Sequence, residues 1–252
     1  MKRRLVPLVI SLFLVQDLTA QSKDEKYYAF DKDWKGTAIE KAVYFLRTKK
    51  LGDKQFLWTT YQIYGPRISQ EVFQDEAGQI RNGYCRYYHP NGQQDSVGTC
   101  TDNLPTGDWW YYNMNGQAIR KKNYEKGLVV KDSVIVPVNS NKQDSTQKTK
   151  EDPAEVESTF KGGIQSWARF LNKNFKYPER ALGVKKEGTV VVQFIVNEEG
   201  AILDPEIITS VEYSLDEEAL RIMSISPKWN PAFQFGKHVK SYKRQPVIFR
   251  LN

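Results

Sequence analysis

The residues that could support covalent or metal chemistry are few in this chain of 252 residues, which holds two cysteines and two histidines. His89 and His238 lie in no metal-binding or catalytic-triad pattern, and no nucleotide-binding or metalloprotease motif is present. Carboxylate pairs occur, but Glu217-Glu218, for example, falls at a predicted helix start, where such side chains are normally solvated. The sequence therefore predicts a protein that is not an enzyme, with no catalytic residues, no metal site and no cofactor.

The two cysteines, Cys85 and Cys100, are a candidate disulfide if the chain is exported to an oxidising compartment. They flank Asn91-Gly92, the turn of a predicted β-hairpin. A two-residue loop would place Cys85 opposite Gly98. A four-residue loop would place it opposite Cys100, at a Cα separation of about 4.5 Å that suits a bridge. We favour the four-residue loop and the disulfide, and the alternative is a pair of reduced, half-buried thiols.

The first 20 residues have the composition of a secretory signal peptide. A basic segment from Lys2 to Arg4 precedes an apolar stretch of 11 residues, Leu5 to Val15, and the pattern ends on a small residue, Ala20. As a helix, this apolar stretch would span about 16 Å, roughly half of a hydrocarbon core of ~30 Å. Cleavage after Ala20 is therefore favoured, and an uncleaved membrane anchor is the alternative.

Composition narrows the class of protein further. A hydrophobic content of 40% with 13% aromatic residues can supply a buried core, which excludes global disorder. No apolar run reaches the ~20 residues of a spanning helix, which excludes a polytopic membrane protein. The net charge of +7 is spread over the chain without a concentrated basic stripe, so we expect no nucleic-acid partner.

A polar stretch divides the chain into two segments. Residues 133–157 contain no aromatic residue and, after Val138, almost no apolar one, so they cannot offset the entropy of becoming ordered. We therefore predict a flexible linker there. The expected organisation is a signal peptide at 1–20, a β-repeat domain at 21–132, the linker at 133–157 and a C-terminal domain at 158–252.

The first segment carries an internal repeat with an offset of 24 residues. Gly83 to Gln93 aligns with Gly107 to Gln117, and each copy is an aromatic run that leads into an Asn-Gly turn. A fainter copy ends at Ala77-Gly78-Gln79. Over residues 65–127 this pattern resembles bacterial MORN-type repeats, and the resemblance implies an antiparallel β-meander of hairpins.

Upstream of the repeats the pattern is less regular. Residues 56–64 read as a strand that ends at Gly65-Pro66. Residues 42–47 are ambiguous, because Thr37 and Glu40 fit a helix capping box while Val43-Tyr44-Phe45 favours a strand. We favour the strand.

The second segment predicts the order helix, strand, strand, helix, strand. Apolar residues recur at helical spacing from Ile164 to Phe175, and Tyr177-Pro178 ends that helix. Ser214 and Glu217 form a capping box that would begin the second helix. The strands are expected at residues 188–196, 201–209 and 246–251, where Val247, Phe249 and Leu251 would face the core.

Several landmarks of this segment fall in order at domain-like spacing. They include Tyr177-Pro178, the run Glu187 to Val192, Leu215-Asp216, Trp229 and Ile248-Phe249. Over residues 158–252 the segment resembles the TonB C-terminal domain. The resemblance implies an α+β domain with two helices on a three-stranded antiparallel sheet.

The same resemblance implies a periplasmic domain that binds outer-membrane receptors by β-strand addition. The accepting edge would be the last strand, formed by Val247, Ile248, Phe249, Arg250 and Leu251. Tyr177 and Pro178 match the family's region near the receptor contact. The alternatives are a sheet edge without a partner and, for Tyr177-Pro178, a helix stop with a packed ring.

A basic cluster precedes the last strand and could meet acidic receptor segments or anionic lipid. Its members are Lys237, Lys240, Lys243 and Arg244, and the alternative is a solvated loop. The chain departs from a full TonB transducer because it lacks a Pro-rich spanning stretch and a long anchor. An energised transducer therefore stands beside a non-energised periplasmic scaffold or adaptor. Expected partners are outer-membrane TonB-dependent receptors, other envelope proteins or a second copy, with only peripheral membrane contact unless residues 1–20 are retained.

Overall fold

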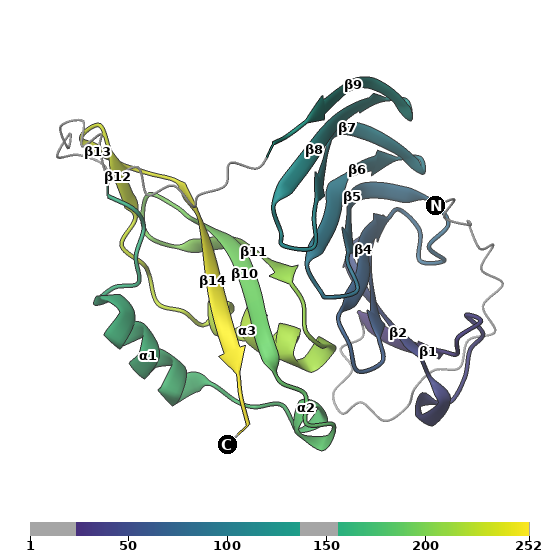
Figure 1. Cartoon of the computed structure of the whole chain (residues 1–252), viewed down its shortest axis with the longest axis horizontal. Helices are drawn as coiled ribbons and strands as arrows, with labels where there is room; N and C mark the ends of the chain where they lie inside the picture. Colours follow the sequence, from purple (N-terminus) through teal and green to yellow (C-terminus); the bar gives the residue numbers. More distant parts are fainter. Residues whose placement is uncertain (1–23, 137–155, 252) are drawn as a thin grey trace.

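A computed structural model of the chain describes residues 24–136 and 156–251. The predicted signal peptide and most of the predicted linker lie outside these ranges. The described residues form two regions that lie side by side, a β-meander and an α+β region (Figure 1). The predicted α+β fold class is therefore confirmed.

Residues 24–136 form an antiparallel sheet in which each strand pairs with the next along the chain. This arrangement confirms the predicted meander, although its identity as MORN repeats stays a prediction. Residues 42–47, which were ambiguous in sequence, belong mostly to β2, and the capping-box region forms only a short 3-10 helix, Ile39–Lys41. The strands are β1 (Glu25–Phe30), β2 (Tyr44–Gly52), β3 (Gln55–Gln62), β4 (Arg67–Phe73), β5 (Arg81–Tyr88), β6 (Gln94–Thr101), β7 (Leu104–Tyr112), β8 (Ala118–Glu125) and β9 (Leu128–Val134).

The two Asn-Gly turns have the same geometry, as the repeat predicts. Gly92 and Gly116 have φ angles of 84° and 75°, in the left-handed region that glycine adopts without strain. In each hairpin the residue three positions before the glycine donates its N–H to the carbonyl of the following glutamine, at 2.7 Å for Gln93 and 2.9 Å for Gln117. Each turn is therefore a three-residue loop, a common hairpin connection.

This geometry corrects the predicted register of the cysteines. Cys85 lies opposite Gly98, and Cys100 lies opposite Gly83, so the predicted four-residue loop is wrong. The three-residue loop, together with a bulge at Asp95, restores the register that a two-residue loop would give. The cysteines are diagonal neighbours with free, buried thiols whose Sγ atoms are 3.2 Å apart. The disulfide stays a prediction.

Residues 156–251 fold around a three-stranded antiparallel sheet in the order β11-β10-β14. Helices lie on one face of this sheet, as predicted, and a small hairpin precedes its last strand (Figure 1). The elements are α1 (Gly163–Asn174), α2 (Glu179–Gly183), β10 (Gly188–Val196), β11 (Ile202–Thr209), α3 (Tyr213–Ser224), β12 (Ala232–Gln234), β13 (Lys237–Val239) and β14 (Ser241–Phe249).

The core of this region lies between the sheet and the helices. Every second residue of β10 is fully buried, from Val190 to Val196, and contributes to one cluster with Trp167 of α1 and Leu215 of α3. Burial of a Val, Leu or Phe side chain stabilises the fold by roughly 1.5–3 kcal/mol. Ile164, which the helical spacing places on the apolar face of α1, is instead 85% exposed.

Helix α3 begins two residues earlier than predicted and uses a different cap. The carboxylate of Glu212 accepts a hydrogen bond from the backbone N–H of Ser214 at 2.8 Å. Glu212 is fully buried and is held by Arg180 at 2.6 Å. This fixed carboxylate takes the capping role, so the predicted box of Ser214 and Glu217 is wrong.

The two regions pack through an aromatic cluster at the start of α3. The Tyr213 ring contacts Phe45 at 5.1 Å, Tyr61 at 5.5 Å and Tyr27 at 6.2 Å, each edge to face. The last three side chains come from β1, β2 and β3 of the meander and are buried. Tyr213 therefore extends the core of the meander into the C-terminal region.

Candidate partner-binding site

Strand β14 forms one edge of the C-terminal sheet, and its outer side is open from Arg244 to Phe249 (Figure 1). No other strand within the described ranges pairs with that side. Near its start, Lys243 pairs with Glu157 at 3.0 Å. An open row of backbone N–H and C=O groups is what strand addition requires.

The predicted alternation of buried and exposed side chains along β14 is confirmed from Val247 to Phe249. Val247 and Phe249 are fully buried, whereas Ile248 is 52% exposed on the opposite face. The strand ends at Phe249, so Arg250 and Leu251 lie beyond it, because pairing with β10 stops at Gly188 opposite Phe249. Leu251 is half-buried, and its backbone N–H donates to the carboxylate of Glu187.

Pro246 sets the hydrogen-bonding pattern of this edge. The register with β10 runs without a shift through Pro246, which lies opposite Val191. Because proline has no N–H, an uninterrupted ladder requires its nitrogen to face the outer side. The backbone groups of Arg244 and Ile248, two positions away on either side, then face outward as well. The outer side thus offers N–H donors with a gap at Pro246.

The opposite edge of the sheet is closed at its end by the meander. Thr209 of β11 forms a bridge with Gln93, and the Thr209 hydroxyl donates to the Gln93 side chain at 3.1 Å. The N–H of Ser210 donates to the carbonyl of Gly92 at 2.9 Å. A Cβ atom at Gly92 would lie 1.9 Å from the carbonyl oxygen of Ser210, so only glycine fits there.

Tyr177 and Pro178 lie beside the end of β14. The ring of Tyr177 packs edge to face against Phe249, with 5.9 Å between centroids. Its hydroxyl donates to the carbonyl of Lys186 at 2.5 Å. Pro178 has extended backbone angles and caps α2. The structure therefore brings Tyr177 together with the predicted edge, in a position that also supports the fold.

The four basic residues do not share one surface. Lys237 and Lys240 are exposed at and just after β13, in a hairpin where a solvated loop was the alternative interpretation. Lys243 and Arg244 are successive residues of β14 and project to opposite faces of the sheet. Lys243 pairs with Glu157, and Nε of Arg244 donates to Gln193 at 3.1 Å. Their role as a binding patch stays a prediction.

A buried ion pair joins the meander to α3. Nε of Arg67, at the start of β4, lies 3.0 Å from Oδ2 of Asp216, and both side chains are almost completely buried. Asp216 also accepts from the Ser210 hydroxyl at 2.7 Å and the Val211 N–H at 3.1 Å. Burial raises the pKa of Asp216 to about 6, against the lowering effects of Arg67 and these donors.

A second ion pair lies beside the first. Nη1 of Arg47 is 2.9 Å from the carboxylate of Glu217, and Nη2 of the same arginine is 2.7 Å from Glu25. The pKa of Glu25 is lowered to about 2, because hydrogen bonds and charge from Arg47 outweigh the opposing effect of burial. Glu217 is therefore an interdomain contact, not the solvated carboxylate that its helix-start position suggests.

These interdomain arginines were missed by sequence reasoning. One signal was available, because Arg86 occupies the repeat position where the second copy has Trp110. Arg86 contacts the carboxylate of Glu206 and donates to the carbonyl of Ile207 at 3.3 Å, both on β11. Arg86, the charged residue that interrupts the aromatic repeat, therefore lies at the contact between the two regions.

Within the residues that the structure describes, no cluster of three or more His, Cys, Asp or Glu side chains could hold a metal ion. None of the helices in the two described ranges combines the length and apolarity needed to cross a bilayer.

Comparison with known proteins identifies the C-terminal region. Residues 173–251 match the family model described as the Gram-negative bacterial TonB protein C-terminal. No curated protein and no solved structure matches the chain. The C-terminal region of the chain is therefore similar to the TonB C-terminal domain, and this likeness covers residues 173–251.

Proposed function

We propose that this chain is a TonB-like periplasmic protein that binds outer-membrane receptors by β-strand addition at β14 and takes part in energy-dependent transport. The observation that supports this most directly is the open outer side of β14, residues 244–249, within a TonB C-terminal domain. The meander pairs with the end of the other edge at Thr209, whereas no strand of the described residues pairs with the outer side of β14.

The proposed contact combines backbone pairing with a shallow side-chain surface. The outward-facing backbone groups of Arg244 and Ile248 would bond the added strand. Exposed side chains on the same face as Ile248, including Tyr242 at 75% exposure, would contact alternate residues of that strand. Arg250 and Leu251 would extend the contact beyond the strand end.

The test titrates the full chain with N-terminal segments of outer-membrane receptors from the native host. Ile248→Pro removes an outward donor and bends the strand, which should weaken binding by about 10- to 100-fold if two or three bonds are disrupted. The matched control is Ile248→Thr, which keeps the N–H and should bind nearly as well as wild type. Circular dichroism confirms that each variant is folded.

A substitution that adds a backbone donor to the same edge gives a second test. Pro246→Val adds the missing donor to the outer side and should tighten binding by about fivefold, for one bond of about 1 kcal/mol. If folded Ile248→Pro binds as well as wild type, or if Pro246→Val has no effect, recognition does not run through this edge.

A second candidate function is a non-energised scaffold or adaptor whose repeats bind cell-envelope partners. The observation that favours it is the docking of the meander by one buried and one partly buried ion pair, which suits a fixed two-part adaptor better than a tethered domain. An anchor distinguishes the two, because coupling to the proton-motive force requires attachment to the cytoplasmic membrane. Retention of residues 1–20 in the native host would support transduction, and their removal would support the adaptor.

A further inference from the structure

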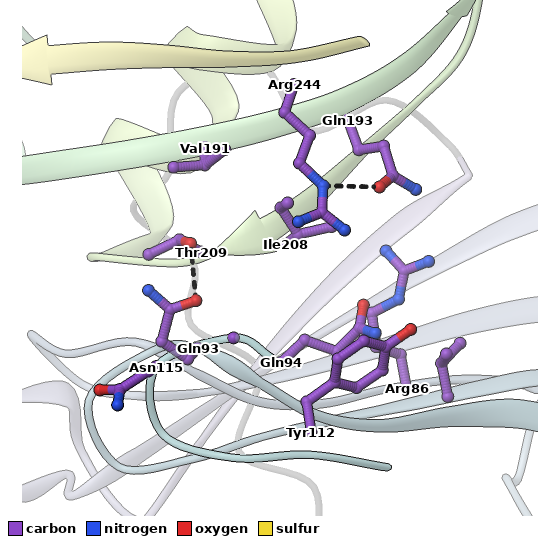
Figure 2. A pocket seen from close by; sticks show the side chains of 12 residues that line it. Arg86, Gln93, Gln94, Tyr112, Asn115, Val191, Gln193, Ile208, Thr209 and Arg244 are labelled. Carbon is purple, nitrogen blue, oxygen red and sulfur yellow. Dashed lines mark hydrogen bonds between the residues drawn. The ribbon is translucent and has the colours of Figure 1, made fainter. Parts of the chain in front are cut away.

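A cavity of about 230 Å³ lies between the meander and the face of the C-terminal sheet that the helices leave uncovered (Figure 2). At about 30 Å³ per water molecule, it has room for roughly eight waters or one ligand of amino-acid size. The hairpin tips at Gln93 and Asn115 form one wall, and residues of β10, β11 and β14 form the other. The cavity therefore exists only while the two regions are docked.

Two guanidinium groups enter this space from opposite walls, from Arg86 of β5 and Arg244 of β14 (Figure 2). Arg86 is only 4% exposed, and its Nε atom is buried with no hydrogen-bond partner among the described residues. Leaving a charged donor unsatisfied inside a protein is costly. A residue that lines the cavity therefore carries an unsatisfied donor among the described residues.

The charge of the cavity suits a monoanion. The residues that line the cavity include the two arginines and no Asp or Glu. Glu206, which does not line the cavity, forms an ion pair with Arg86 and offsets the charge of that arginine. Arg244 has neutral Gln193 as its hydrogen-bond acceptor among the described residues. One positive charge is therefore left uncompensated. A carboxylate would balance it, whereas doubly charged phosphate would overcompensate it.

The remaining polar groups are neutral. Oε1 of Gln93 accepts from Thr209, and Oε1 of Gln193 accepts from Arg244, so both amides keep their NH₂ donors. Burial raises the pKa of Tyr112, which keeps its hydroxyl protonated. Such donors and acceptors match the amide group of a peptide or an acylated amino acid.

We propose that this cavity is a binding site for a small amide-bearing carboxylate, such as the terminal residue of a peptide, with its carboxylate between Arg86 and Arg244. The guanidinium fork matches a carboxylate, and such charge-assisted bonds are about twice as strong as neutral ones. The site shares Arg244 with the proposed receptor edge, but it uses the side chain of Arg244, whereas strand addition uses the backbone groups of that residue. Occupancy would stabilise the docked arrangement, because the ligand contacts both regions.

The experiment titrates the ¹⁵N-labelled full chain with N-acetylalanine and follows the arginine Nε–H resonances by NMR. We expect shifts at Arg86 and Arg244, a dissociation constant in the millimolar range and a rise in melting temperature. N-acetylalanine amide, which lacks the charge, should bind at least tenfold more weakly. Arg244→Gln should weaken N-acetylalanine binding by about 10- to 100-fold.

Arg169→Gln is the matched control, because it removes an exposed arginine from α1, which covers the other face of the sheet. It should bind N-acetylalanine as wild type does. Absence of binding up to tens of millimolar would overturn the proposal, as would equal affinity for the amide or an unchanged Arg244→Gln. Tighter binding of inorganic phosphate would overturn the assignment to a carboxylate.

Discussion

Replacing Arg67 with methionine tests whether the buried ion pair holds the meander against the C-terminal domain. Arg67 is 3% exposed, and its Nε donates to Asp216 at 3.0 Å and to the Tyr61 hydroxyl at 2.7 Å. Methionine fills much of the same volume but carries no charge. The variant therefore leaves the fully buried carboxylate of Asp216 with neutral donors only, from Ser210 and Val211.

We expect the variant to lose about 3–5 kcal/mol of stability at neutral pH, the usual cost of removing one partner of a buried pair. The variant can lose this stability in two ways. Asp216 can stay buried at that cost, or the two regions can separate so that water reaches the carboxylate. In the second case the loss appears as undocking, and a larger radius of gyration in small-angle scattering would reveal it.

The pH dependence gives an independent signature. The folded-state pKa of Asp216 is raised from 3.8 to about 6, so the folded chain binds this proton more tightly than the unfolded chain does. The resulting stabilisation, about 3 kcal/mol for two units, is fully present below pH 4 and is lost as the pH rises through 6. Without Arg67 the pKa rises further. The deficit of the variant relative to wild type should therefore shrink as the pH falls from 8 to 5.

The assay is urea unfolding followed by tryptophan fluorescence at several pH values. The double variant Arg67→Met/Asp216→Asn removes both charges and should recover much of the loss at pH 7.5. Arg120→Met, which removes the exposed partner of Asp132, should stay close to wild type. If Arg67→Met matches wild type at pH 7.5, or if its deficit does not change with pH, the reasoning fails.

Three further predictions concern other parts of the chain. Tyr213→Ala should lower the free energy of unfolding by about 2–4 kcal/mol, because three ring contacts are lost. The control Tyr242→Ala lies at an exposed site and should change that free energy little. Urea titration measures both variants. Thiol titration of the denatured chain from the native envelope should detect no free thiol if Cys85 and Cys100 are bridged, and two free thiols would contradict the bridge. Intact mass of the native protein should show Gln21 as the first residue, and a full-length species would contradict cleavage.

Local patterns predicted the repeat hairpins of the meander and the main helices and strands of the C-terminal region, because adjacent residues encode each of them, but they did not predict β1 or the β12–β13 hairpin. The Asn-Gly turns and aromatic runs gave the meander, and the alternation of Val247, Ile248 and Phe249 gave the buried face of β14. Boundaries were less accurate where pairing decides them. β14 begins at Ser241 because β10 pairs with it back to Val196, a contact that no local pattern encodes.

The register of the cysteines failed for a related reason. The four-residue loop was favoured because it would bring the two cysteines opposite each other, and the bulge at Asp95 left no signal in the sequence. The interdomain pairs were also invisible, because Arg67 and Asp216 are 149 residues apart. Only their unusual burial distinguishes them from surface charges, and burial is a property of the docked structure.

The docking also bears on which edge of the C-terminal sheet accepts a partner. A three-stranded sheet has two edges, and backbone pairing alone does not distinguish them. Here the tip of the β5–β6 hairpin occupies the end of β11 through Gln93 and Gly92, at an approach that only glycine permits. Undocking would free this second edge and remove the cavity at the same time. If Arg67→Met separates the two regions, we therefore expect three linked changes: a larger radius of gyration, a loss of N-acetylalanine binding and a second site for strand addition. Receptor segments should then bind at a stoichiometry above one, whereas a ratio that stays at one in an undocked variant would show that the meander does not restrict the choice of edge.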